Sequence, residues 1–179
     1  QFNLSAFQAI FEFAHQNFLL DYAGVFLARF LPYLLVLGFI VIVFRQTGWR
    51  RRTLLFVEGI LAIILARGVV TEIIRFAYPY PRPFLVFGFE ALIKEGGWSF
   101  PSGHAAFFFG LAVIVWHTNR RWGMWFLVLS LINGIARIFA GVHWPLDIAG
   151  GILVGLASGL LVHHLLARTI QALRAPSAQ

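Results

Sequence analysis

The chain has 179 residues, of which 60% are hydrophobic and only 12% are charged, and its mean hydropathy is +0.81. Soluble domains are about 45–50% apolar and about 25% charged, so this composition excludes an ordinary soluble enzyme. The net charge of +7 does not indicate a nucleic-acid partner here, because basic residues on a membrane protein mark the helix ends that stay in the cytoplasm. The absence of cysteine excludes disulfides, thiolate nucleophiles and Cys-ligated metal sites.

The first segment, residues 5–18, predicts an amphipathic helix that lies in the membrane interface. Ser5 and Gln8 have the spacing of a capping box at the start of such a helix. Its apolar residues recur at helical spacing, whereas polar residues occupy the other faces. These apolar residues are Phe7, Ile10, Phe11, Ala14 and Phe18.

Longer apolar segments follow, and about 20 such residues are needed to cross the hydrocarbon core. They cover residues 23–44, 54–76, 102–116, 122–140 and 146–167, the third being the shortest. Only helices and closed barrels satisfy the backbone inside a membrane. We therefore expect an all-α integral membrane bundle with five transmembrane helices, which forms a single domain over residues 1–179.

Basic residues in the connections predict the orientation, since short cytoplasmic loops are enriched in Lys and Arg. Eight arginines fall on one side of the expected bundle: Arg45, Arg50, Arg51, Arg52, Arg120, Arg121, Arg168 and Arg174. On the other side, Lys94 is the only basic residue outside the motifs described below. We therefore expect the carboxyl terminus in the cytoplasm and the amino terminus outside.

Three glycines recur every four residues in the last apolar segment, at positions Gly151, Gly155 and Gly159. Small residues at this spacing let helix backbones approach closely. The spacing favours packing within the chain and leaves a homodimer through this face as the alternative.

Ionisable residues gather at the expected outer ends of the segments, and such residues at membrane depth usually mark function. The cluster consists of Arg75, Arg82, His104, Arg137, His143 and Asp147. Three guanidinium groups directed to one place suit a phosphate group. Ser102 and Gly103 add a hydroxyl and free backbone N–H groups at a helix start, where anions bind well.

The two histidines of the cluster predict different roles. His143 precedes Asp147 by four residues, so the carboxylate can hold one ring nitrogen and leave the other free to attack phosphorus. His143 is therefore the candidate nucleophile, which forms a phosphohistidine. His104 is the candidate general acid for the leaving oxygen, and it could then deprotonate the attacking water.

Few carboxylates lie near the cluster, namely Asp147 and Glu72. A Mg²⁺ or two-metal site needs several oxygen ligands, and the arginines already supply positive charge. We therefore expect a metal-independent site without a cofactor.

In chain order, Arg75-x6-Arg82-Pro83, Pro101-Ser102-Gly103-His104 and Arg137-x5-His143-x3-Asp147 resemble the three-part signature of the type 2 phosphatidic acid phosphatase superfamily. The chain departs from this signature at two positions. The family usually has Lys where Arg75 stands, and it has Ser where this chain has Ala136.

The resemblance implies phosphate binding by Arg75, Arg82, Ser102, Gly103 and Arg137, with His104 as the acid, His143 as the nucleophile and Asp147 as its partner. The short length, the amphipathic start and the residues around Pro81–Phe84 resemble bacterial undecaprenyl-diphosphate phosphatases. This narrower resemblance implies conversion of undecaprenyl diphosphate to undecaprenyl phosphate, on the periplasmic or extracellular side of the bacterial cytoplasmic membrane. The expected partners are the lipid phosphate substrate and membrane lipids.

Other lipid substrates remain open, namely phosphatidylglycerophosphate, phosphatidate and lipid A. A protein of another class, a non-catalytic lipid-phosphate binder or transporter, is the second hypothesis. It is disfavoured because binding alone needs neither an acid nor an oriented nucleophile.

Several further polar and aromatic residues have two interpretations. Arg67 could extend a polar path below Arg75, but an ion pair with Glu72 is favoured. Trp98 and Trp144 could wall the mouth of the site, although tryptophans near span ends also form interfacial belts. The loop at residues 90–97 is expected to cap the pocket.

Four residues toward the expected inner side have a structural or interfacial interpretation. They are Glu58, His117, His163 and His164.

Overall fold

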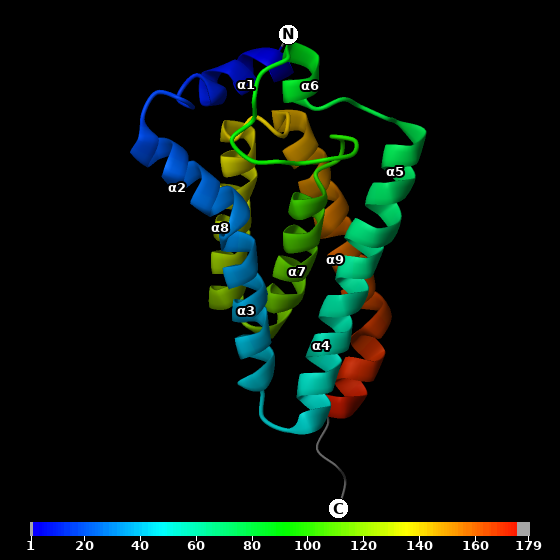
Figure 1. Cartoon of the computed structure of the whole chain (residues 1–179). Coiled ribbons are helices and arrows are strands. Elements are labelled where there is room, and N and C mark those ends of the chain that lie inside the picture. The colour runs from blue at the N-terminus through cyan, green and yellow to red at the C-terminus, as the bar shows by residue number, and fades with distance from the viewer. Residues whose placement is uncertain (1, 175–179) are drawn as a thin grey trace, which may run out of the picture.

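The computed structural model describes residues 2–174, with side chains through residue 166, and within this part of the chain it is helical without strands. It confirms the all-α membrane bundle (Figure 1). The elements are α1 (Phe2–Phe11), α2 (Phe18–Arg29), α3 (Leu31–Phe44), α4 (Trp49–Ile63), the π-helical segment η1 (Ile64–Val70), α5 (Thr71–Ala77), α6 (Pro83–Phe87), α7 (Gly103–Thr118), α8 (Arg120–Phe139) and α9 (Pro145–Arg174).

Within the described residues, three helical stretches are long and apolar enough to cross a membrane, namely Trp49–Ala77, Arg120–Phe139 and Pro145–Leu166. Helices α2 and α3 reach the length and apolarity of a span only together, and a bend of 41° separates them. The bend coincides with a proline in the first turn of α3, where the missing N–H is tolerated.

Of the five predicted spans, residues 102–116, the shortest, do not form a helix long enough to pass as a span. Helix α7 has only 16 residues, or about 24 Å of rise, against about 30 Å of hydrocarbon. Most of α7 is buried, and it contacts α3, α4, η1, α8 and α9. Because α7 faces protein instead of lipid, its length need not match the bilayer, and its first turn lies below α1 and α6 at the end of the bundle (Figure 1).

The three glycines of α9 pack on α7 of the same chain. This is the arrangement that the sequence favoured over a homodimer through the glycine face. A Cβ at Gly155 would stand 2.6 Å from the carbonyl oxygen of Ala106, and neighbouring contacts at Gly151 and Gly159 are equally close. Only glycine permits such an approach of two backbones. This face is therefore covered by α7.

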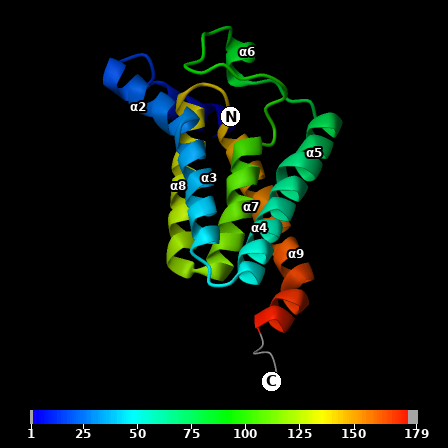
Figure 2. The same cartoon turned by 60° about the horizontal axis from the view of Figure 1, so that its bottom comes forward.

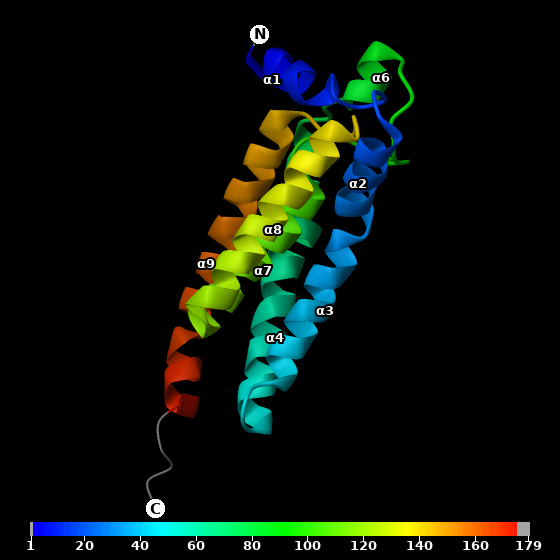
Figure 3. The same ribbon diagram turned by 90° about the vertical axis from the view of Figure 1, so that its left-hand side faces the viewer.

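Helix α1 lies across one end of the bundle, as expected of an interfacial helix (Figure 3). Phe7 is 2% exposed and packs on Trp144, with 5.2 Å between the ring centroids. The helix covers only the first half of the predicted segment, and it begins at Phe2, so the prediction of a capping box at Ser5 was wrong. The cause is a tertiary contact, because the side-chain oxygen of Asn3 accepts a hydrogen bond of 3.0 Å from the backbone N–H of Leu146 and holds the first turn.

The connection between α5 and α7, which includes α6, crosses the same end of the bundle from α5 toward α2 (Figure 2). The described chain begins at this end and leaves the bundle at the other (Figure 1).

The packing of α9 on α7 generates a stability prediction. Gly155→Ala should destabilise the protein by about 1–3 kcal/mol, because the added methyl group overpacks the contact. Gly68→Ala is the matched control, since a Cβ there meets nothing within 4 Å. The melting temperature in detergent should fall only for Gly155→Ala, and equal melting temperatures for the two variants would contradict this packing.

Candidate active site

The six ionisable residues expected to cluster all lie at the end of the bundle covered by α1 and α6. Four of them are almost fully buried, since Arg82, Arg137, His143 and Asp147 are only 1–2% exposed. Burial of this many charged groups requires partners for each of them. Those partners define the geometry of the site.

His143 and Asp147 form the pair that their spacing predicts. The distance from His143 Nδ1 to Asp147 Oδ2 is 3.1 Å. The same carboxylate oxygen accepts the backbone N–H of Trp144 at 2.8 Å and the hydroxyl of Ser99. Asp147 can reach back in this way because it lies in the first turn of α9. With Nδ1–H donating to Asp147, the lone pair of His143 lies on Nε2.

In this tautomer, His143 Nε2 accepts a hydrogen bond from Arg82. Arg82 Nη1 lies 3.3 Å from His143 Nε2 and donates to the carbonyl of Val142 at 2.8 Å. Burial, followed by the charges of Arg137 and Arg82, lowers the pKa of His143 well below its usual value. Burial also lowers the pKa of Arg82 to about 10, which leaves this group charged at neutral pH. The arrangement thus keeps His143 neutral beside a cation.

Arg82 also fastens the connection between α5 and α7 over His143. Its Nε donates to the carbonyl of Gly97 at 3.0 Å, and its Nη2 donates to the carbonyl of Gly96 at 2.9 Å. Gly97 has a φ of +70°, which favours glycine. The loop at residues 90–97 therefore lies over the site, as expected.

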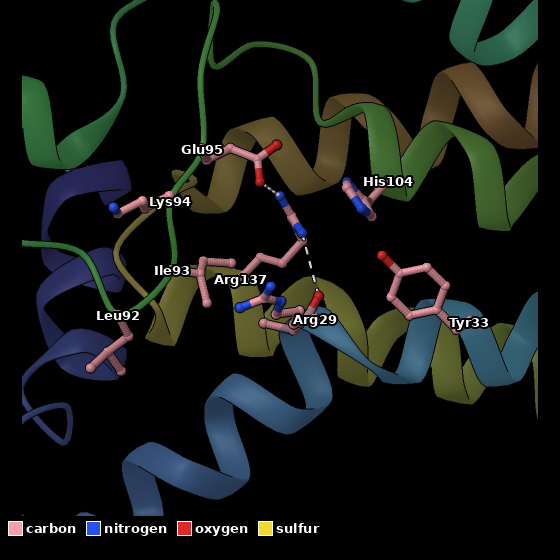
Figure 4. Close-up of a pocket in the computed structure, with 9 residues that line it drawn as sticks. Arg29, Tyr33, Leu92, Ile93, Lys94, Glu95, His104 and Arg137 are labelled. Atoms are coloured by element: carbon pink, nitrogen blue, oxygen red, sulfur yellow. Dashed lines mark hydrogen bonds and ion pairs between the residues drawn. The ribbon is translucent and has the colours of Figure 1, made fainter.

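Arg137 is bound to a carboxylate that the sequence did not single out. Its Nη2 lies 2.6 Å from Glu95 Oε2 (Figure 4). Arg82 Nη2 lies 3.8 Å from Glu95 Oε1. Burial would raise the pKa of Glu95, but the charges of the two arginines and the hydrogen bond from Arg137 outweigh it, so the pKa lies below its usual value. Arg137 Nε is buried without a hydrogen-bond partner among the described residues. The carboxylate of Glu95 thus binds Arg137, while the Nε–H of Arg137 remains available as a donor.

Arg75 contacts the backbone just before α7. Its Nε and Nη2 lie 3.3 and 3.1 Å from the carbonyl oxygen of Pro101, and its Nη1 lies 3.4 Å from Glu72. Glu72 also pairs with Arg67, so the favoured interpretation of Arg67 as an ion-pair partner is confirmed. Glu72 thus supports the site through Arg75.

The start of α7 joins the second motif to the third. The backbone N–H of Ser102 donates to the backbone carbonyl of Asp147 at 2.9 Å. The Ser102 hydroxyl caps the helix by accepting the N–H of Ala105 at 3.5 Å. Gly103 and His104 form the first turn, and His104 lines a cavity of about 590 Å³ together with Glu95 and Arg137.

The two tryptophans do not line this cavity. Trp144 is buried, and its indole N–H donates to the carbonyl of Pro81 at 2.9 Å. Trp98 is 48% exposed, and its carbonyl accepts a hydrogen bond from Arg82 at 3.4 Å. Both residues therefore hold the connection that covers the site.

Contacts between residues that are far apart in the sequence could not be predicted from it. Ser99 and Asp147 are 48 positions apart, and Glu95 could not be told from Glu90 by any sequence signal. At the opposite end of the bundle, His163 Nδ1 lies 2.6 Å from Glu58, and the His117 and His163 rings stack at 3.8 Å. This second cluster is separate from the site.

Within the part of the chain that the structure describes, no group of three or more His, Asp or Glu residues has the arrangement of a metal site.

Comparison with known proteins identifies the family. The model of the PAP2 superfamily matches residues 56–171. "Undecaprenyl-diphosphatase BcrC" of Bacillus subtilis is 31% identical over 162 residues, which are 89% of this chain and 81% of that protein. "Bacitracin transport permease protein BcrC" of Bacillus licheniformis is 32% identical over 164 residues, or 90% and 79% of the two chains.

Two solved structures share the fold. The crystal structure of Aquifex aeolicus LpxE has a TM-score of 0.75 and 26% identity, with 92% of this chain and 96% of that chain covered. A PAP2-type phosphatidylglycerolphosphate phosphatase from Bacillus subtilis has a TM-score of 0.64 and 24% identity, with 92% and 86% covered. The chain belongs to the PAP2 superfamily and is a membrane lipid phosphatase.

Proposed function

We propose that the protein removes the terminal phosphate of a lipid diphosphate carrier, converting undecaprenyl diphosphate to undecaprenyl phosphate through a phosphohistidine. The observation that carries this proposal is the buried His143–Asp147 pair at 3.1 Å, which leaves the lone pair of His143 on Nε2, next to the Arg82 guanidinium. The name of the Bacillus subtilis relative supports the choice of substrate. The relatives include a protein named as a transport permease, but transport or binding alone does not need an oriented nucleophile.

In the first step, the terminal phosphate binds Arg137 and the first N–H groups of α7, with Arg75 and Arg82 nearby. His143 Nε2 attacks phosphorus, and the bond from phosphorus to the bridging oxygen breaks. His104 donates a proton to the leaving oxygen. Asp147 stabilises the positive charge that develops on the His143 ring, as the carboxylate of a catalytic triad does.

In the second step, His104 accepts a proton from water, and the resulting oxygen nucleophile attacks phosphorus. The phosphorus–nitrogen bond breaks, which releases phosphate and restores neutral His143. The arginines supply the positive charge that a metal ion provides in other phosphatases, so we propose that no metal is required.

The assay for this proposal measures phosphate release by the purified protein in excess EDTA. Undecaprenyl diphosphate should be cleaved with a higher kcat/KM than phosphatidylglycerophosphate or phosphatidate. His143→Ala should abolish release, and His104→Ala should lower kcat by about 10²- to 10⁴-fold, the usual contribution of a general acid. Full activity of His143→Ala would contradict the mechanism, and a preference for phosphatidylglycerophosphate would contradict the substrate.

Glu95 gives a second prediction, because its carboxylate occupies an anion position on Arg137 that a phosphate needs. Glu95→Gln should lower the inhibition constant of inorganic phosphate by about tenfold, since a hydrogen bond to a charged group contributes about 1.5 kcal/mol. Glu90→Gln is the control, because Glu90 is exposed in the same connection. An unchanged inhibition constant in Glu95→Gln would show that phosphate binds elsewhere.

We also propose that the site end faces the outside of the bacterial cytoplasmic membrane. Six of the eight orienting arginines flank the connections at the opposite end of the bundle, between α3 and α4 and between α7 and α8. Arg168 and Arg174 lie outside the residues whose side chains are described. An impermeant thiol reagent should label Glu90→Cys but not Asn119→Cys in intact cells, and the reverse pattern would invert the orientation.

A further inference from the structure

A second cavity meets the first at His104. It has a volume of about 220 Å³ and is lined by residues of α2, α3, η1 and α7. Three residues line both cavities, namely Arg29, Tyr33 and His104. Figure 4 shows the Tyr33 hydroxyl directed toward the His104 ring from α3. His104 therefore stands at the boundary between the two cavities.

The second cavity is positively charged beside the start of α7. The Arg67 side chain packs on Gly103. Its Nε and Cδ are the atoms nearest to the position that a Cβ of residue 103 would occupy. Arg67 lies within the π-helical turn η1, and such turns are frequent at functional sites. Although it pairs with Glu72, its side chain remains 39% exposed.

Arg29 supplies a second positive charge. It is the last residue of α2, just before the bend into α3, and it lines both cavities. No Asp or Glu of the described part of the chain forms an ion pair with it. None of the residues that line the second cavity is acidic, so its two arginines are opposed only by Glu72, which pairs with Arg67 from outside the lining.

The rest of the lining is apolar. Pro32, Val36, Phe107 and Phe108 form this part. Val36 is 36% exposed, and α3 and α5 diverge toward this end of the bundle with α7 between them (Figure 1). The cavity thus offers a cationic region next to His104 and an apolar region that reaches the lipid-facing surface, as the head and first tail segment of a phosphorylated lipid require.

We propose that Arg67 and Arg29 form a second anion subsite, which binds the phosphate that stays on the lipid, so that the enzyme selects diphosphate headgroups. This inference rests on the proposed role of His104 as the acid. The oxygen that receives its proton belongs to the leaving group, so the leaving group lies on the second-cavity side. A monophosphate ester releases a neutral alcohol there, whereas a diphosphate releases a lipid phosphate whose negative charge needs cationic partners.

The test compares substrates that share a tail and differ only by one phosphate, farnesyl diphosphate and farnesyl phosphate. Arg29→Gln and Arg67→Gln should each lower kcat/KM for the diphosphate by about tenfold or more, while the value for the monophosphate changes less than about threefold. Arg67→Lys should restore part of the loss. Arg120→Gln, an exposed arginine at the other end, is the control and should change neither value.

An equal loss on both substrates would assign the arginines a structural role and overturn the subsite. No loss on the diphosphate would overturn it as well.

Soluble anions separate this inference from the proposed substrate. Pyrophosphate should inhibit the wild-type enzyme more strongly than phosphate does, and Arg67→Gln should remove that preference. If the wild-type enzyme cleaves only monophosphates, the proposed function fails, and the inhibition ratio still decides the subsite. A pyrophosphate preference that disappears in Arg67→Gln supports it, and an equal inhibition by both anions in the wild-type enzyme overturns it.

Discussion

The contact between α7 and α9 is the constraint on which the site depends. A Cβ at Gly151 would stand 2.5 Å from the carbonyl oxygen of Ser102, so the two backbones approach as closely as glycine permits. At the same level, the Ser102 N–H donates to the Asp147 carbonyl at 2.9 Å. This contact brings the start of α7, which carries His104, beside the start of α9, which orients His143. A wider helix spacing would separate the acid from the nucleophile.

Charge is the second organising feature of the site. Arg82 and Arg137 are 1% and 2% exposed, and burial of cations is costly unless anions or carbonyl groups compensate for it. Backbone carbonyls satisfy most donors of Arg82, whereas Arg137 has Glu95, the carbonyl of Ala28 at 3.4 Å and an unused Nε. Of the arginines, Arg137 is thus best placed to exchange an internal carboxylate for a substrate phosphate. Burial, followed by the charges of these arginines, keeps the pKa of His143 low, which suits a nucleophile.

The sequence predicted the helical bundle and the gathering of the six ionisable residues, because apolar length and polar positions at helix ends carry those signals. It could not predict partners that depend on the path of a loop. Glu95 and Arg137 are 42 positions apart in the sequence. Only the path of the folded connection determines that Glu95, and not Glu90, contacts Arg137. The start of α1 was misplaced for a similar reason, since a contact from Asn3 to α9 overrides a local capping signal. The burial of α7 was also hidden, because an apolar sequence does not tell lipid from protein neighbours.

The central claim is that His143 carries the phosphoryl group during turnover. The most direct measurement is to quench the enzyme during hydrolysis of a terminally labelled lipid diphosphate under alkaline conditions, which preserve phosphohistidine, and to locate the label by peptide mass spectrometry. The account predicts a phosphoryl group on His143 that is lost in acid and absent from His143→Ala. A label on another residue, or rapid turnover without any phosphoenzyme, would contradict it.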